Sequence, residues 1–293
     1  MSRDAAWRTP LPPNSRDRFA ALVRGDATPA LGPAALEIAR IAYPDLDPGP
    51  SLRQLDGLAA AIRPHLGAVA TPADAAAIVA ARLSDPLGFH GNRDDYYDPR
   101  NSFLNDVLER RTGIPITLAA VLIEVGARLG VRIEGVGFPG HFLACAAGAR
   151  GPRFFDPFFD GQELDDVALL ERLRAVSGPP GGQTAVLTHV PPELLATVTT
   201  GEILGRMLRN LLRVYLERNE PLSALEAVER LLLLRPDAPE ELRTRAQIYE
   251  RLECFAAARA DYERYLALAP DAAAARDVRA RLARLAHDEP TVH

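Results

Sequence analysis

Residues 88–130 read GFHGNRDDYYDPRNSFLNDVLERRTGIPITLAAVLIEVGARLG, and 135–147 (GVGFPGHFLACAA) and 154–158 (FFDPF) complete the part of the chain that decides the fold. Apolar residues at helical spacing after a Gly-Ile-Pro predict a helix over Pro115–Leu129, which Gly130 ends. Alternating stretches after it predict short strands at 131–136, 141–146 and about 154–156. A helix N-terminus, then a histidine, then an aspartate is the order of a Cys-His-Asp acyl-transfer site. No cysteine stands at the start of this helix.

His141 and Asp156 are predicted to lie together on one face of the sheet. A hairpin closed through Gly148-Ala149 pairs positions whose numbers sum to 297, which sets His141 opposite Asp156. A four-residue loop, Gly148 to Gly151, changes the sum to 299 and makes the two residues diagonal neighbours on the same face. A carboxylate beside an imidazole fixes its tautomer and supports its charge, as in acyl transfer. The same pair also fits a purely structural hydrogen bond.

The nucleophile of such a site is the open question. Cys145 shares a strand with His141 but lies about 13 Å along it, at about 3.3 Å per residue, so we expect a buried apolar role. Cys254 falls within a helical repeat and is expected to pack there. Two hydroxyls stand near the helix start: Thr112, suited to an N-cap, and Thr117 in the first turn. Thr117 is the alternative nucleophile, although a threonine hydroxyl needs a strong base to attack.

The segment Gly88–Arg100 is predicted to be a polar loop. Four of its side chains are of the kind that hold a hard cation, namely His90, Asp94, Asp95 and Asp98. Their spacing fits no ordered calcium loop, and turns and helix caps use the same residue types. We therefore predict no metal site and no cofactor, and keep a metal held near His90 and His141 as an alternative.

Helical patterns before the loop define much of a first domain, predicted over 17–177. The expected helices span Ala34–Tyr43, Leu52–Ile62, Ala73–Leu83 and Asn101–Arg110. Thr71 is suited to cap the third of them, since Pro72 follows it at the first helical position. Residues 1–16, rich in Pro, Arg and Ser, predict a flexible arm, and 178–190, which contain GPPGGQ, predict a linker.

The remainder, 191–293, is predicted to be entirely helical, with an internal period of 34 residues. Arg235-Pro236-Asp237 recurs as Ala269-Pro270-Asp271, and Tyr215, Ala224 and Leu232 recur as Tyr249, Ala258 and Leu266. This pattern resembles the tetratricopeptide repeat, a helical hairpin whose small alanines let two helices approach closely. We expect two repeats (204–237 and 238–271) and a capping helix (272–286). Because two repeats are few for an independent solenoid, they should pack on the first domain.

The composition is that of an ordinary globular protein, with 293 residues of which 47% are hydrophobic and 25% charged. A net charge of −5 argues against a general nucleic-acid binder. The two cysteines fall in different predicted domains, which argues against a disulfide framework, and the N-terminus has charges and prolines where a signal peptide needs an apolar run. No stretch approaches the ~20 apolar residues that span a bilayer. We predict a cytoplasmic protein that binds neither nucleic acid nor membrane, and leave its oligomeric state open.

Three segments carry a resemblance to a known family: GFHGNRDDYYDPRNSFLNDVLERRTGIPITL (88–118), VGFPGHFL (136–143) and DPFFDG (156–161). They resemble the SirB-type branch of the transglutaminase-like superfamily, which commonly carries C-terminal tetratricopeptide repeats. The resemblance covers about 34–165 and the repeats. It implies an α+β, papain-like core in which a helix presents the nucleophile to a sheet bearing a histidine and an aspartate.

The resemblance also implies roles for individual residues. His141 corresponds to the general base and Asp156 to the orienting acid, while the cysteine position falls at about Pro115–Thr117, where this chain departs from the catalytic pattern. We favour a transglutaminase-like protein without its thiol, which binds a protein or peptide partner in the former cleft and on the helical repeats. The alternative is a hydrolase or acyltransferase with Thr117 as nucleophile. The predicted cleft residues are Asn92, Tyr96, Asn101, Asn105, Pro115 and Phe138.

Overall fold

The structure is a computed structural model that describes residues 14–23, 30–177 and 188–285. The predicted arm lies outside these residues up to position 13, and its last three positions already belong to the first helix. The GPPGGQ segment of the predicted linker also lies outside them. Within the described ranges, every helix is too short or too polar to cross a membrane.

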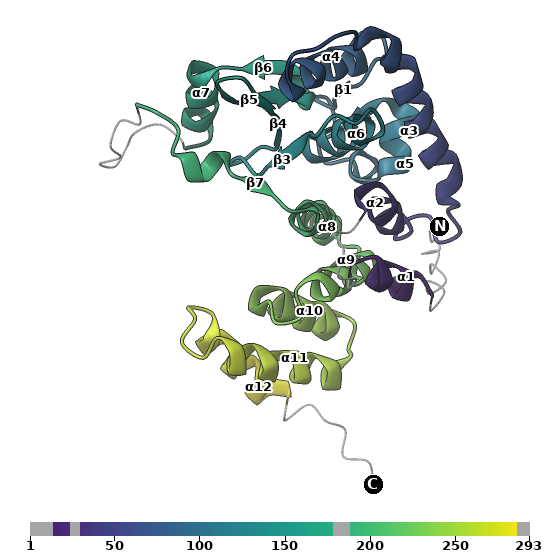
Figure 1. Ribbon diagram of the computed structural model, residues 1–293. Coiled ribbons are helices and arrows are strands. Elements are labelled where there is room, and N and C mark those ends of the chain that lie inside the picture. The colour runs from purple at the N-terminus through teal and green to yellow at the C-terminus, as the bar shows by residue number, and fades with distance from the viewer. Residues whose placement is uncertain (1–13, 24–29, 178–187, 286–293) are drawn as a thin grey trace.

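The first part of the chain folds into helices around a small sheet (Figure 1). Its helices are α1 (Asn14–Val23), α2 (Leu31–Ala39), α3 (Pro48–Ile62), α4 (Pro72–Ser84), α5 (Leu104–Arg110), α6 (Pro115–Arg128) and α7 (Asp166–Ser177), with short 3-10 turns η1 (Arg63–His65), η2 (Pro99–Asn101), η3 (Pro157–Phe159) and η4 (Pro192–Leu195). Its strands are β1 (His90–Gly91), β2 (Thr112–Gly113), β3 (Glu134–Val136), β4 (Leu143–Gly148), β5 (Gly151–Asp156), β6 (Gln162–Leu164) and β7 (Thr197–Val198).

Five of these strands form one antiparallel sheet in the order β6-β5-β4-β3-β7. Successive residues of β4 face opposite layers, as strand geometry requires. Ala144 belongs to the apolar cluster that contains α4 and α6, whereas Leu143 and Cys145 belong to a second cluster that contains Leu169 and Leu173 of α7. The sheet therefore lies between α4 and α6 on one side and α7 on the other (Figure 1).

Two predictions about the sheet need correction. The region after Pro191 is not entirely helical, because β7 pairs with β3 through Val198 and Thr197 and extends the sheet by one strand. A strand of two residues is too short to show a period in the sequence. His141 does not begin a strand either, since β4 starts at Leu143 and His141 lies in the preceding turn.

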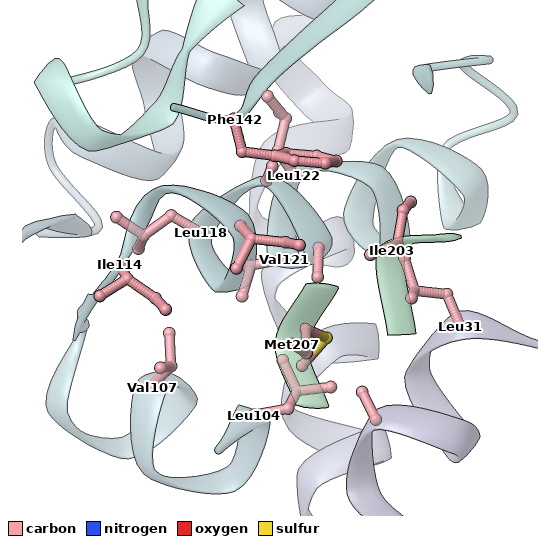
Figure 2. Close-up of a cluster of buried hydrophobic side chains, with 14 of the residues drawn as sticks. Leu31, Leu104, Val107, Ile114, Leu118, Val121, Leu122, Phe142, Ile203 and Met207 are labelled. Atoms are coloured by element: carbon pink, nitrogen blue, oxygen red, sulfur yellow. The ribbon is translucent and has the colours of Figure 1, made fainter. Parts of the chain in front are cut away.

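α6 is the central helix of the molecule. Its residues from Pro115 to Leu122, together with Val125 and Gly126, are all buried. A helix that is apolar around most of its circumference has to be surrounded, and α6 is covered by α3, α4, α5, β4 and α8. Figure 2 shows side chains of α6, α5 and α8 meeting in this cluster. Gly130, with φ of +75°, ends the last turn as predicted.

The start of α4 also follows the sequence prediction. Thr71 accepts a hydrogen bond from the Asp74 N–H at 3.2 Å, and the Asp74 carboxylate accepts one from the Thr71 N–H at 3.0 Å. This reciprocal arrangement is a capping box, and Pro72 stands at the first helical position. The predicted cap at Thr71 is thus confirmed.

The helical repeats follow as α8 (Thr200–Glu217), α9 (Pro221–Leu234), α10 (Pro239–Arg251), α11 (Phe255–Leu268) and α12 (Ala275–Leu285). The repeat alanines Ala224 and Ala258 are fully buried in the two hairpins, as the pattern predicts. α8 packs on α2 and α6, and α9 packs on α1, so the expected docking of the repeats on the first domain is confirmed. α10 to α12 extend away from the core (Figure 1). The α+β core followed by helical repeats is the predicted fold class.

Because α8 shares its core with α6, its buried leucines should stabilise both parts of the molecule. We expect Leu204→Ala, at a side chain with no exposed surface, to lower the free energy of unfolding by about 2–5 kcal/mol. The matched control is Leu222→Ala on α9, where the leucine is 45% exposed and the change should stay within about 0.5 kcal/mol. Urea unfolding followed by circular dichroism measures both. Equal effects of the two substitutions would contradict a shared core.

Candidate functional site

The turn between β3 and β4 delivers His141 to the edge of the sheet. The His141 N–H donates to the Phe138 carbonyl at 3.1 Å, which closes the turn. Gly140 has φ of +63°, a conformation that L side chains rarely adopt, and a side chain there would also collide with Val176 of α7. The turn therefore requires glycine at 140. Its conformation fixes the backbone of His141 and thereby the place of the imidazole.

The pairing of His141 with Asp156 is confirmed. β4 and β5 pair with Ala144 opposite Phe155, which is the register of the four-residue loop. The Nε2 atom of His141 lies 3.0 Å and 2.9 Å from the two carboxylate oxygens of Asp156. Sequence reasoning left two registers open, and both kept the two side chains on one face.

Asp156 is completely buried and has further donors besides the imidazole. The guanidinium of Arg172, from α7, lies 3.0 Å from its Oδ2. The N–H groups of Phe158 and Phe159 donate to its Oδ1 at 3.0 and 3.3 Å. A buried carboxylate of this kind is stable only when its oxygens are satisfied, and here four donors satisfy them.

This contact defines how the imidazole can act. With Nε2 directed at the carboxylate, that nitrogen carries the hydrogen of a neutral ring and Nδ1 carries the lone pair. None of the described residues bonds to Nδ1 of His141. The ring lies beside the rings of Phe158 and Phe159, each with its centroid 6.0 Å away. His141 is thus an oriented base whose Nδ1 is available to a group in the adjoining space.

That space is a pocket of about 500 Å³, which we call the His141 pocket. Its walls are the start of α6 at Pro115 and Ile116, the turn 138–142, the loop at Tyr96–Tyr97 and one face of α8. The predicted cleft residues Tyr96, Pro115 and Phe138 therefore do share a pocket with His141. Its volume suits a short peptide segment or a small molecule.

The start of α6 offers no nucleophile to this pocket. Pro115 and Ile116 line it, while Thr117 has no exposed surface. The Thr117 hydroxyl donates to the Asn101 carbonyl at 2.6 Å and accepts from the Ile114 N–H at 3.2 Å. The geometry gives no support to the alternative hypothesis, because the Thr117 hydroxyl already satisfies two buried backbone groups.

The two cysteine thiols do not supply a nucleophile to the His141 pocket either. Cys145 is buried against the α7 layer, and burial, with the charge of Glu134, raises its pKa to about 11. A thiol with that pKa remains protonated at neutral pH and is a weak nucleophile. Cys254 precedes α11 in the second repeat, where it is exposed and outside the His141 pocket. Cys145 has the buried position that the sequence predicts, whereas the predicted packing of Cys254 is wrong, because this residue is the exposed N-cap of α11.

The three asparagines among the predicted cleft residues do not line the His141 pocket. The Asn92 amide donates to the Asn101 side-chain oxygen at 3.0 Å, and Asn101 donates to the Asp95 carbonyl at 2.7 Å. These bonds hold the loop that carries Tyr96 and Tyr97. Asn105 is partly buried on α5 and does not line the His141 pocket. Asn92 and Asn101 thus stabilise the loop that forms one wall of the pocket.

The polar loop gathers no metal ligands. Among the described residues no three His, Cys, Asp or Glu side chains lie close enough to share an ion. The side chain of His90 contacts the Gly88 carbonyl and the Thr112 hydroxyl. The predicted cap of α6 at Thr112 is wrong, because the hydroxyl of Thr112 bonds to His90 and not to the first turn of α6. Asp98 caps η2 and pairs with Arg100 and Arg110.

Sequence reasoning missed the contribution of α8 to the pocket. Arg206, Arg209, Asn210 and Arg213 form one polar stripe of this helix, at spacings of three, four and seven residues, and all four line the pocket. The spacing is visible in the sequence. What the sequence does not show is that this stripe faces the His141 turn and not solvent.

Comparison with known proteins agrees with this architecture. The family described as transglutaminase-like superfamily matches residues 50–209, and the tetratricopeptide repeat matches 211–283. The chain belongs to the transglutaminase-like superfamily. No solved structure matches the chain.

Several relatives share this transglutaminase-like region. A UPF0162 protein of Xylella fastidiosa is 38% identical over 92% of this chain and 94% of its own length. A UPF0162 protein of Pseudomonas aeruginosa is 36% identical over 83% of this chain and 86% of its own. The human F-box only protein 21 is 32% identical over 58% of this chain, which corresponds to 27% of that protein.

The structural role of Thr117 can be tested by two substitutions. Thr117→Val removes the hydroxyl and leaves the Asn101 carbonyl and Ile114 N–H without their buried partner, which should cost about 1–3 kcal/mol of stability. Thr117→Ser keeps the hydroxyl and should cost less. Urea unfolding at neutral pH compares the free energies of unfolding of the two variants with that of the wild type. A valine variant as stable as the wild type would show that the hydroxyl is not needed for folding.

The loop that carries Tyr96 and Tyr97 should be sensitive to acid at Asp98. Burial raises the pKa of this carboxyl, but the hydrogen bonds and charges of Arg100 and Arg110 outweigh burial and hold the pKa below its ordinary value. A lowered pKa means that the ionised carboxylate stabilises the fold above about pH 3.9, the pKa of an unfolded aspartate. That contribution is lost as the pH falls through the lower pKa of the folded state.

Asp98→Asn isolates this charge, because asparagine can still cap η2. We expect the wild type to be more stable than the variant at pH 6 and the difference to shrink toward pH 3. Unfolding in urea at pH 6 and at pH 3 measures this difference in stability. A difference that does not change with pH would contradict a role for the ionised carboxylate.

Proposed function

We propose that this protein is a non-catalytic member of the transglutaminase-like superfamily that binds a segment of a partner protein. The His141 pocket would receive the segment, and the helical repeats would hold a further part of the partner. The match to tetratricopeptide repeats supports a protein-interaction module, since such repeats present extended surfaces to peptides.

The observation that carries the proposal is the composition of the pocket beside His141. Acyl transfer requires a nucleophile within hydrogen-bond reach of its base. The start of α6 supplies only Pro115 and Ile116 there, and the Thr117 hydroxyl is bonded to the backbone. An oriented base without a nucleophile supports a binding role for the pocket.

The shape and chemistry of the pocket also support binding of a peptide. Apolar and aromatic surfaces of Tyr96, Phe138 and Phe142 lie next to the polar groups of α8. Such a combination is typical of sites that hold a side chain and fix its orientation. Our proposal includes a cytoplasmic location, which two unpaired thiols support.

Affinity capture with the full chain as bait tests the proposal. Tyr97→Ala changes a half-exposed wall of the pocket, and Val69→Ala changes an exposed apolar side chain before α4, outside the pocket and the repeats. We expect the wild type and Val69→Ala to retain the same partner protein from a lysate and Tyr97→Ala to lose most of it. Retention by Tyr97→Ala at the wild-type level would exclude the pocket as the binding surface.

A second assay tests the non-catalytic part of the proposal. Incorporation of a biotinylated amine into a glutamine peptide, and release of ammonia from it, should proceed at the same background rate for the wild type and His141→Ala. Turnover that depends on His141 would show that the protein is an enzyme.

A further inference from the structure

Three arginines of α8 give the His141 pocket a positively charged wall. Arg206, Arg209 and Arg213 all line it. The chain as a whole has a net charge of −5, so this concentration of cations is local. The question is whether carboxylates of the protein already neutralise them.

Arg206 is half-buried and has no carboxylate partner among the described residues. Its guanidinium donates to the carbonyls of Gly137 at 3.0 Å and His141 at 3.4 Å and lies 5.7 Å from the Phe142 ring. Burial, followed by the nearby charge of Arg209, lowers its pKa. A cation that is partly desolvated without a counter-charge gains from an anion brought by a ligand.

The acid nearest along the helix, Glu202, acts on Arg206 through its charge but is not bonded to it. It accepts hydrogen bonds from the Thr199 N–H at 2.7 Å and the Thr199 hydroxyl at 2.8 Å and so completes the capping box of α8. Gly137, in turn, leaves room for Arg206, because a side chain there would meet the guanidinium at 2.8 Å. The turn is thus shaped around the cation.

Arg213 is exposed at the other end of the wall. Its guanidinium lies 5.2 Å from the centre of the Tyr97 ring, and the described part of the chain offers it no carboxylate within bonding distance. Arg209, between the two, bonds to Glu241 of α10 at 3.0 Å. Of the three arginines, the two outer ones are therefore available to a ligand.

The acid paired with His141 is not available to neutralise them either. Asp156 is completely buried and already accepts from His141, Arg172 and two backbone N–H groups. The remaining walls contribute Tyr96, Tyr97, Phe138 and the start of α6, none of which is acidic. The pocket consequently carries an uncompensated positive charge.

Building on the proposed function, we propose that the His141 pocket recognises an acidic segment of a partner protein, with two carboxylates bound by Arg206 and Arg213. Seven helical residues separate these arginines, which is about 10.5 Å along α8 at 1.5 Å per residue. In the polyproline II conformation, which has three residues per turn and a rise of about 3.1 Å, side chains at i and i+3 lie on one face about 9 Å apart. The ligand is therefore a segment in this conformation with Asp or Glu at positions i and i+3, whose apolar side chains contact Phe138 and the two tyrosines.

Fluorescence anisotropy with the full chain tests this specificity. The probe is a fluorescein-labelled peptide, SELSELS, compared with the uncharged SQLSQLS and the basic SKLSKLS. We expect binding of the acidic peptide alone, weaker at high salt because the contacts are ionic. Arg206→Gln and Arg213→Gln should each weaken it by roughly tenfold, the usual effect of losing one charged hydrogen-bonding partner.

Arg276→Gln is the matched control, since Arg276 is an exposed arginine of α12 outside the pocket, and it should bind the acidic peptide like the wild type. Because Arg206 also holds the turn, circular dichroism checks its fold, and Arg213→Gln, at an exposed side chain, gives the same test without that complication.

Three results would overturn the inference. Equal binding of the uncharged peptide would disprove the charge requirement while leaving peptide binding in place. Absence of binding by all three peptides would reject the acidic ligand, and the capture experiment with Tyr97→Ala then decides the proposed function separately. Displacement of the probe by ATP at lower concentration than by unlabelled SELSELS would assign the arginines to phosphate.

Discussion

The burial of α6 on nearly all sides is the constraint on which the rest of the structure depends. A helix whose residues from Pro115 to Leu122 are all buried has to lie in the middle of the fold. The sheet, α3, α4, α5 and α8 are then arranged around it. Pro115 and Ile116 of its first turn are held by this packing, and they form one wall of the His141 pocket.

The His141–Asp156 pair has a structural explanation that does not need catalysis. Asp156 joins three elements: it accepts from the β3–β4 turn through His141, from α7 through Arg172 and from η3 through backbone N–H groups. Loss of any donor would leave a buried charge less well compensated, which is costly. The same geometry that suits a general base is therefore also required to hold α7 and the turn together, so the pair alone is weak evidence for an enzyme.

Local chemistry made much of the fold predictable from the sequence. The cap at Thr71, the end of α6 at Gly130 and the buried alanines Ala224 and Ala258 depend on contacts within a few residues or within one hairpin. The pairing of His141 with Asp156 was predictable because both possible registers place them on one face.

The remaining features depend on contacts between distant parts of the chain. Thr117 shares its first-turn position with an attacking residue, but its hydroxyl is bonded to Asn101, sixteen residues earlier, and no local pattern encodes that. β7 is two residues long and becomes a strand only because β3 has a free edge. The arginines of α8 have the spacing of an ordinary solvent-exposed stripe, and only the packing of α8 on α6 turns Arg206 toward the His141 turn.

α8 consequently connects the two parts of the molecule in two ways. Its apolar stripe, with Ile203 and Met207, is part of the core that contains α6 (Figure 2). Its polar stripe borders the pocket, and Arg209 of that stripe bonds to Glu241 of α10, the first helix of the second hairpin. A segment bound at Arg206 and Arg213 would flank Arg209, which bonds to the second hairpin. The pocket and the repeat surface therefore share a rigid helix, which suits a protein that holds one partner at two adjoining places.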